Sequence, residues 1–149
     1  MTAARVLLVV AHPVIGSAIE TLLRLEGDYD VKRVASVSDA TKVAEWAPQV
    51  ALVDGTLLGA VSSAAIGAPA YVLSGSERDG RQLARKLDDG RGWLRKDATG
   101  AELAKAIDAL LAGETHSEGG LGRLGVATIV ILSVVVLALV AYLIWLAVY

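Results

Sequence analysis

Short apolar runs alternate with amphipathic stretches along the first 113 residues of this 149-residue chain. Five runs are continuous and end at turn residues or polar side chains, as strands buried on both faces of a parallel sheet do. We expect strands at residues 5–10, 31–35, 50–53, 70–73 and 92–95. Because they alternate with helices at this spacing, the pattern predicts a doubly wound α/β fold with helices on both faces of the sheet.

Amphipathic helices are expected between these strands. The first is predicted by four apolar residues at helical spacing, which are Ile15, Ile19, Leu22 and Leu23. Ser38 is the expected N-cap of a second helix that runs to Trp46. Residues 56–69 are rich in Ala, Ser and Gly and only weakly helical.

The last helix of this region begins at a capping box. Thr99 and Glu102 are three residues apart, so their side chains can satisfy each other's backbone donors. The expected core-facing stripe consists of Leu103, Ile107, Leu110 and Leu111.

The C-terminal part has a different pattern, because residues 124–149 contain no charged side chain. A helix over residues 124–148 would be about 37 Å long, enough to cross a hydrocarbon core of about 30 Å. A buried helix or a pair of β-branched strands is the alternative, and the uninterrupted length argues against it. We expect a domain at residues 1–113, a flexible glycine-rich linker at 114–123 and a transmembrane helix at 124–149. Arg123 beside the span favours a tail-anchored, single-pass protein in the cell membrane with its N-terminal domain in the cytoplasm.

Composition excludes several function classes. The formal charge of −2 and the pI of about 5.6 argue against a nucleic-acid partner. The absence of cysteine excludes disulfides and thiolate sites, and the presence of only two histidines argues against a His-rich metal site. The mean hydropathy of +0.55 is high for a soluble domain because of the uncharged C-terminal part.

Chemistry-bearing residues follow four of the expected strands. Ala11 and His12 follow the first strand, and Asp54, Ser74 and Lys96 follow the third, fourth and fifth. Sites in doubly wound folds form beyond the carboxyl ends of the strands. A carboxylate, a hydroxyl and an ammonium are therefore expected to converge there.

This arrangement resembles the receiver domain of bacterial response regulators, the CheY-like fold, and most of all the NarL type that precedes a helix-turn-helix domain. The resemblance covers residues 5–113 and is carried by RVLLVVAHP, VALVD, YVLS and GWLRKDA. It implies the strand order 2-1-3-4-5. It also implies that Asp54 matches the phosphoacceptor, Ser74 the switch hydroxyl and Lys96 the phosphate-binding lysine. Trp93 stands where the family usually has a switch Tyr or Phe.

The sequence departs from the family at the metal site. Two adjacent acids hold Mg²⁺ in the family, and Val10 and Ala11 occupy their positions here. Magnesium requires oxygen ligands, so Asp54 alone is a poor site, whereas Asp54 and Lys96 form a neutral pair without a metal. The third crossover is also short, and the expected membrane helix replaces the DNA-binding domain. We therefore interpret the domain as a degenerate pseudo-receiver and expect no metal and no cofactor.

Each candidate also has a structural interpretation. Asp54 is more simply a structural carboxylate paired with Lys96, Ser74 and His12 are turn residues, and Trp93 is a packing or partner-facing aromatic. Seven basic residues between positions 78 and 96 are either a solvated face or a contact for anionic lipid or an acidic partner.

Three functions remain open from the sequence. The favoured one is a non-enzymatic regulatory or protein-interaction module at the membrane, with an unidentified membrane or cytoplasmic protein and membrane lipid as partners. The alternatives are a phospho-accepting receiver of a two-component phosphorelay and a small accessory subunit of a membrane complex. The missing acid pair separates the first from the second, whereas fold alone does not decide.

Overall fold

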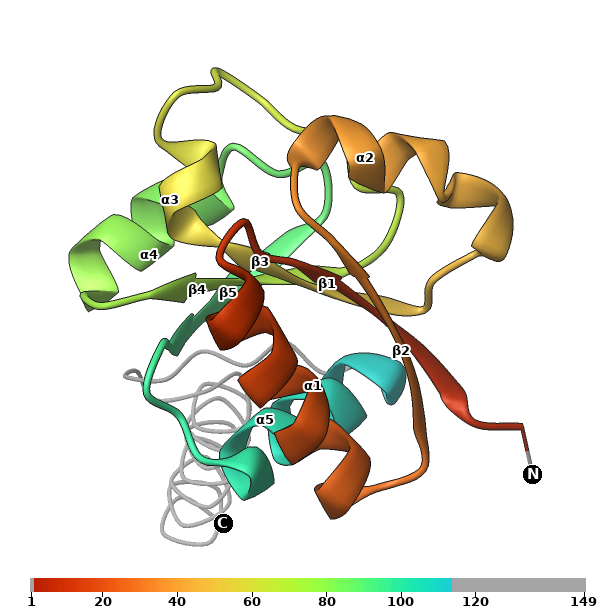
Figure 1. Ribbon diagram of the computed structural model, residues 1–149. Coiled ribbons are helices and arrows are strands. Elements are labelled where there is room, and N and C mark those ends of the chain that lie inside the picture. Colours follow the sequence, from red (N-terminus) through yellow and green to blue (C-terminus); the bar gives the residue numbers. More distant parts are fainter. Residues whose placement is uncertain (1, 114–149) are drawn as a thin grey trace, which may run out of the picture. The chain divides into compact units, whose positions relative to one another are not determined.

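A five-stranded parallel sheet forms the centre of the computed structural model, which describes residues 2–113 (Figure 1). The strands are β1 (Ala4–Val9), β2 (Tyr29–Val34), β3 (Val50–Asp54), β4 (Ala70–Ser74) and β5 (Gly90–Arg95). They are hydrogen-bonded in the order β2-β1-β3-β4-β5, and all pairs are parallel. The expected fold and the order 2-1-3-4-5 are confirmed, with strand limits that differ by one or two residues.

Helices cover both faces of the sheet (Figure 1). One layer contains α1 (Pro13–Glu26) and α5 (Gly100–Leu111), which contact each other. The second layer consists of α2 (Val37–Lys42), the 3₁₀ helix η1 (Ala44–Trp46), α3 (Gly55–Leu58) and α4 (Glu77–Ala84). Each layer has its own hydrophobic cluster against the sheet, so the two layers bury separate sets of side chains.

The two central strands explain the continuous apolar runs. Every residue of β3 and β4 is buried, because helices pack on both faces of these strands. Successive side chains point to opposite faces: Leu52 lies in the α1/α5 cluster, and Val53 lies in the α2–α4 cluster. The apolar run therefore contributes to both cores at once.

The second helix differs from the sequence expectation. The side chain of Ser36, not Ser38, accepts the backbone N–H of Asp39 at 3.1 Å and caps the helix. The helix ends at Lys42, and a separate 3₁₀ turn continues to Trp46. The prediction of Ser38 as the N-cap was wrong because the helix begins at Val37, so Ser38 already lies within its first turn. Ser36 directly precedes the helix, where a side-chain oxygen can accept a backbone N–H that has no partner inside the helix.

The apolar stripes of α1 and α5 are buried only in part. Ile19 and Leu23 of α1 are buried, and so are three of the four expected stripe residues of α5. Ile15 and Leu22 of the apolar face of α1 are instead 44% and 37% exposed. Leu111 is 39% exposed, so its expected place in the core-facing stripe of α5 was wrong. The capping box is confirmed: Thr99 N–H donates to Glu102 at 2.7 Å, and Glu102 N–H donates to Thr99 at 3.3 Å.

The crossover from β3 to β4 contains little helix and is held by its own polar contacts. After the single turn of α3, Ala64 pairs with the segment that follows α4. Its N–H donates to the carbonyl of Lys86 at 2.8 Å. The carboxylate of Asp88 accepts the backbone N–H groups of Ile66 and Gly67 at 3.0 and 3.2 Å. These bonds supply the partners that a regular helix would have provided.

Among residues 2–113, no helix is long and apolar enough to cross a membrane. The expected linker at 114–123 and the expected transmembrane helix at 124–149 lie outside the described residues.

Candidate functional site

Three of the expected site residues lie at the carboxyl ends of neighbouring strands. Asp54 ends β3, Ser74 ends β4, and Lys96 directly follows β5. The Lys96 Nζ atom lies 2.7 Å from the Asp54 Oδ1 atom. The backbone N–H of Lys96 also donates to the carbonyl of Ser74 at 3.1 Å. The parallel register of β3, β4 and β5 thus places a carboxylate, a hydroxyl and an ammonium at one edge of the sheet.

Asp54 is buried, with 6% of its surface exposed. Its Oδ1 atom accepts hydrogen bonds from Lys96 and from the backbone N–H of Thr56 at 3.0 Å, so Asp54 is also the N-cap of α3. Burial acts to raise the pKa of this carboxyl, but the hydrogen bonds from Lys96 and Thr56 outweigh it and hold the pKa below its usual value. Asp54 is therefore ionised at neutral pH.

Ser74 is engaged in the turn before α4. The Ser74 Oγ atom accepts the backbone N–H of Ser76 at 3.3 Å, and Ser74 is 6% exposed. This hydrogen bond between residues two apart is the pattern of a serine turn. Ser74 thus orients the polypeptide that leads from β4 into α4.

The end of β1 has no side-chain oxygen that could hold a metal ion. Val10 is 2% exposed and belongs to the core that α1 and α5 cover. Ala11 is exposed and carries only a methyl group. One oxygen of Asp54 is already bound by the ammonium of Lys96. A magnesium ion of the kind held by an acid pair does not fit these residues.

Trp93 packs against α4 through a glycine. A Cβ atom at Gly80 would lie 2.7 Å from the Cβ and Cγ atoms of Trp93, so only glycine permits this approach. The indole contributes to the α2–α4 cluster, and its buried Nε1 atom has no hydrogen-bond partner among the described residues. The aromatic side chain is thus part of the contact between β5 and α4, as its packing interpretation expects.

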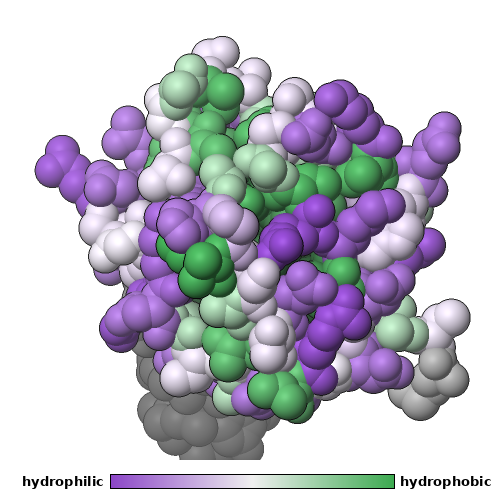
Figure 2. All heavy atoms as spheres, in the orientation of Figure 1, coloured by the Kyte–Doolittle hydropathy of each residue, from purple (hydrophilic) through white to green (hydrophobic). Residues whose placement is uncertain are grey.

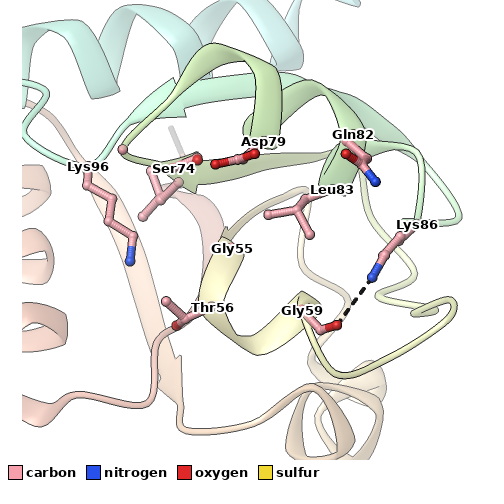
Figure 3. A pocket seen from close by; sticks show the side chains of 11 residues that line it. Gly55, Thr56, Gly59, Ser74, Asp79, Gln82, Leu83, Lys86 and Lys96 are labelled. Carbon is pink, nitrogen blue, oxygen red and sulfur yellow. Dashed lines mark hydrogen bonds between the residues drawn. The ribbon is translucent and has the colours of Figure 1, made fainter.

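A groove of about 430 Å³ runs from this site along α3 and α4. In Figure 3, Lys96 and Ser74 lie at one end of the groove and Lys86 lies at the other. The Lys86 ammonium donates to the carbonyl oxygens of Leu58 and Val61, both at 2.9 Å. The sequence had suggested no role for Lys86 beyond its place in a basic stretch, because backbone acceptors carry no sequence signature.

Most basic residues of the 78–96 stretch have partners. Arg81 pairs with Glu77, and Arg91 and Arg95 pair with Asp89 and Asp97, both at 2.6 Å. Arg78 and Arg85 make no ion pair with a described residue.

His12 precedes α1, where its carbonyl accepts the N–H of Gly16 at 2.9 Å.

The described residues are similar in fold to solved receiver domains. The signal receiver domain of NarL from Mycobacterium tuberculosis has a TM-score of 0.65 at 20% identity, over 76% of this chain and 100% of that one. RcsB from Salmonella typhimurium gives 0.62 at 17%, over 84% and 68%. A LuxR-family two-component response regulator from Aurantimonas sp. SI85-9A1 gives 0.61 at 20%, over 86% and 99%.

No family model and no curated protein matches the chain by sequence. The identities to these structures are low, and the resemblance lies in the arrangement of the sheet and its helices. Residues 2–113 therefore have the fold of response-regulator receiver domains.

Proposed function

We propose that this protein is a membrane-tethered pseudo-receiver that acts as a non-catalytic regulatory or protein-interaction module. One observation carries the proposal: Lys96 neutralises the buried carboxylate of Asp54 at 2.7 Å, while Val10 and Ala11 offer no metal ligand. Transfer of a phosphoryl group depends on positioned cations that stabilise the charge on its oxygens. Here one lysine pairs with one carboxylate, and residues 2–113 contain no cluster of side chains that could hold a metal ion beside them.

Contacts around the site favour a fixed surface over a switching one. Trp93 is packed against Gly80, and Lys86 ties the end of α3 to the segment after α4. Both contacts join elements that border the groove next to Asp54. A partner that recognises α3, α4 and β5 would therefore meet one arrangement of these elements.

Phosphorylation provides the decisive test of this proposal. The full chain is incubated with radiolabelled acetyl phosphate and Mg²⁺, beside a receiver domain that contains both acids as a positive control. We expect no label on this chain. An acyl-phosphate that is lost in Asp54→Asn would contradict the proposal and establish the phospho-accepting alternative.

A matched variant tests the reason for this inactivity. Ala11→Asp restores one acid at an exposed position, whereas Val10→Asp places a charge in the core and will lower stability. We expect the double variant, and not the natural chain, to show a Mg²⁺-dependent rise in melting temperature. If Mg²⁺ raised the melting temperature of the natural chain, and Asp54→Asn abolished this rise, the proposal that Asp54 pairs with Lys96 without a metal would be contradicted.

The membrane tether is the second part of the proposal and rests on the uncharged segment at residues 124–149. The full chain should stay in the membrane pellet after an alkaline carbonate wash. Protease added to the cytoplasmic side should degrade its N-terminal domain. Release of the intact chain into the soluble fraction would contradict the tether.

A further inference from the structure

In the part of the chain that the structure describes, the exposed large hydrophobic side chains belong to one helical layer. Among residues 2–113 there are five, and all belong to α1 or α5: Val14, Ile15, Leu22, Leu25 and Leu111. Val14 and Leu25 are 70% and 77% exposed, well beyond the margin of a packed core. The described residues of the α2–α4 layer contribute none. Scattered exposed apolar residues are ordinary, but confinement to one face marks a contact surface.

On α1 the exposed apolar residues form a continuous stripe. Val14, Ala18, Leu22 and Leu25 are spaced by four, four and three residues, so they share one side of the helix. Ile19 and Leu23 occupy the buried side. Figure 2 shows hydrophobic surface over the position that α1 occupies in Figure 1. The helix is therefore apolar on its core side and on part of its outer side.

This same layer leads to the apolar C-terminal segment. The last turn of α5 ends at Leu111, and residues 112–123 separate it from the uncharged segment that begins at residue 124. The flexible linker that the sequence predicts at 114–123 would have a root-mean-square reach of roughly 17 Å. If residues 124–149 lie in a bilayer, they are not free to cover the stripe, whereas the bilayer surface is within reach of it.

We propose that the α1/α5 layer docks on the surface of the lipid bilayer through the exposed stripe of α1. This rests on the membrane tether of the proposed function. The tether supplies a high effective concentration, so a small apolar contact is enough to orient the domain. α1 carries three charged residues: Arg24 pairs with Glu20 at 3.0 Å, and Glu26, four residues after Leu22, is exposed and leaves the helix with a net negative charge, which does not attract anionic lipid. Docking is therefore apolar and does not require anionic lipid.

The consequence is a defined orientation of the domain. The α2–α4 layer lies on the opposite face of the sheet, so docking through α1 directs α4 and its arginines toward the cytoplasm. The basic stretch 78–96 is by its sequence either a solvated face or a contact for anionic lipid or an acidic partner. The exposed apolar residues instead favour α1, and they leave Arg78 and Arg85 available to a cytoplasmic partner.

Site-specific labelling tests this orientation, since the chain has no cysteine of its own. Thr21→Cys places a fluorescent label on the exposed side of α1, and Gln82→Cys places the matched control label on α4. Each full-length variant is reconstituted into phosphatidylcholine vesicles that contain nitroxide lipids. We expect the label at position 21 to be quenched at least threefold more strongly than the label at position 82. Val14→Ser with Leu25→Ser should reduce quenching at position 21 to the level at position 82.

Each other outcome overturns a particular statement. Equal quenching at both positions would overturn the docking, although the chain still floats with the vesicles. Stronger quenching at position 82 that requires added phosphatidylglycerol would assign the lipid contact to the arginines of α4. Energy transfer between two copies labelled at position 21 that persists on dilution with lipid would show that a second copy covers the stripe. A chain that does not float with vesicles contradicts the tether itself.

Discussion

The ammonium of Lys86 lies 2.9 Å from the carbonyl oxygen of Leu58, the last residue of α3. It lies at the same distance from the carbonyl of Val61. One side chain thus satisfies backbone acceptors of an irregular crossover from the segment after α4. An α-helix in this place would have satisfied those carbonyls itself.

Replacing this lysine should loosen the crossover. Lys86→Met keeps the aliphatic stem and leaves partly buried carbonyls without a donor, which we expect to lower the free energy of unfolding by about 1–3 kcal/mol. Urea unfolding of the chain in a mild non-ionic detergent measures the change. Lys105→Met on the exposed side of α5 is the matched control and should alter stability by less than about 0.5 kcal/mol. Equal effects of the two variants would argue against the clamp.

The close contact of Trp93 with Gly80 should make any larger residue at position 80 destabilising. Gly80→Ala adds a methyl group 2.7 Å from two carbon atoms of Trp93, so the indole or α4 must move. We expect a loss of about 1–3 kcal/mol, as for other overpacked sites, together with a shift in tryptophan emission. Gly75→Ala is the control, because nothing lies within 4 Å of its added carbon. An unchanged emission spectrum in Gly80→Ala would show that the indole is not held there.

The ion pair at Asp54 predicts a specific dependence on acid. The pKa of Asp54 is lower in the folded chain than in the unfolded chain, so its contribution to stability is complete above the unfolded value of about 3.9. That contribution is lost as the pH falls through the folded pKa. Asp54→Asn should be less stable at neutral pH and lose less stability below pH about 4 than the natural chain.

A second substitution separates charge from capping at the same residue. Asp54→Ala also removes the N-cap of α3, which costs about 0.5–2 kcal/mol beyond the loss in Asp54→Asn. Unfolding curves recorded between neutral and acidic pH distinguish the two effects. If the free energy of unfolding of the natural chain and of Asp54→Asn fell equally with decreasing pH, the lowered pKa of Asp54 would be contradicted.

Tyr29 predicts the opposite dependence at high pH. Burial, followed by the hydrogen bond from its hydroxyl to Asp108 at 2.8 Å, raises the pKa of Tyr29 to about 12. Folding thus favours the protonated phenol, and this stabilisation is complete below the unfolded value of about 10 and declines as the pH rises toward the folded pKa. Tyr29→Phe should remove this part of the alkaline loss. The prediction is checked by measuring the free energy of unfolding of both chains at intervals from pH 9 upward, with tyrosinate absorbance followed in parallel.

The sheet could be predicted because its central strands are buried on both faces and therefore read as unbroken apolar runs. The pairing of Asp54 with Lys96 followed from the position of both residues at carboxyl ends of parallel strands. Periodicity could not show whether Leu22 and Leu111 are buried or exposed, because in a helix that is apolar on two sides the sequence does not reveal which side faces the core. The contacts of Lys86 were beyond prediction, since their acceptors are backbone atoms of a distant loop.

The strand order has one more consequence, because it leaves β2 and β5 at the two edges of the sheet. Lys32 and Arg33 are exposed on β2, and Lys32 lies over the ring of Trp46, 5.5 Å from its centre. On the other edge, β5 carries Arg91 and Arg95 and pairs with β4 through an irregular register near Tyr71. Charge and irregularity both oppose the addition of a further strand. Copies of this domain crowded on a small area should therefore remain separate sheets rather than aggregate edge to edge.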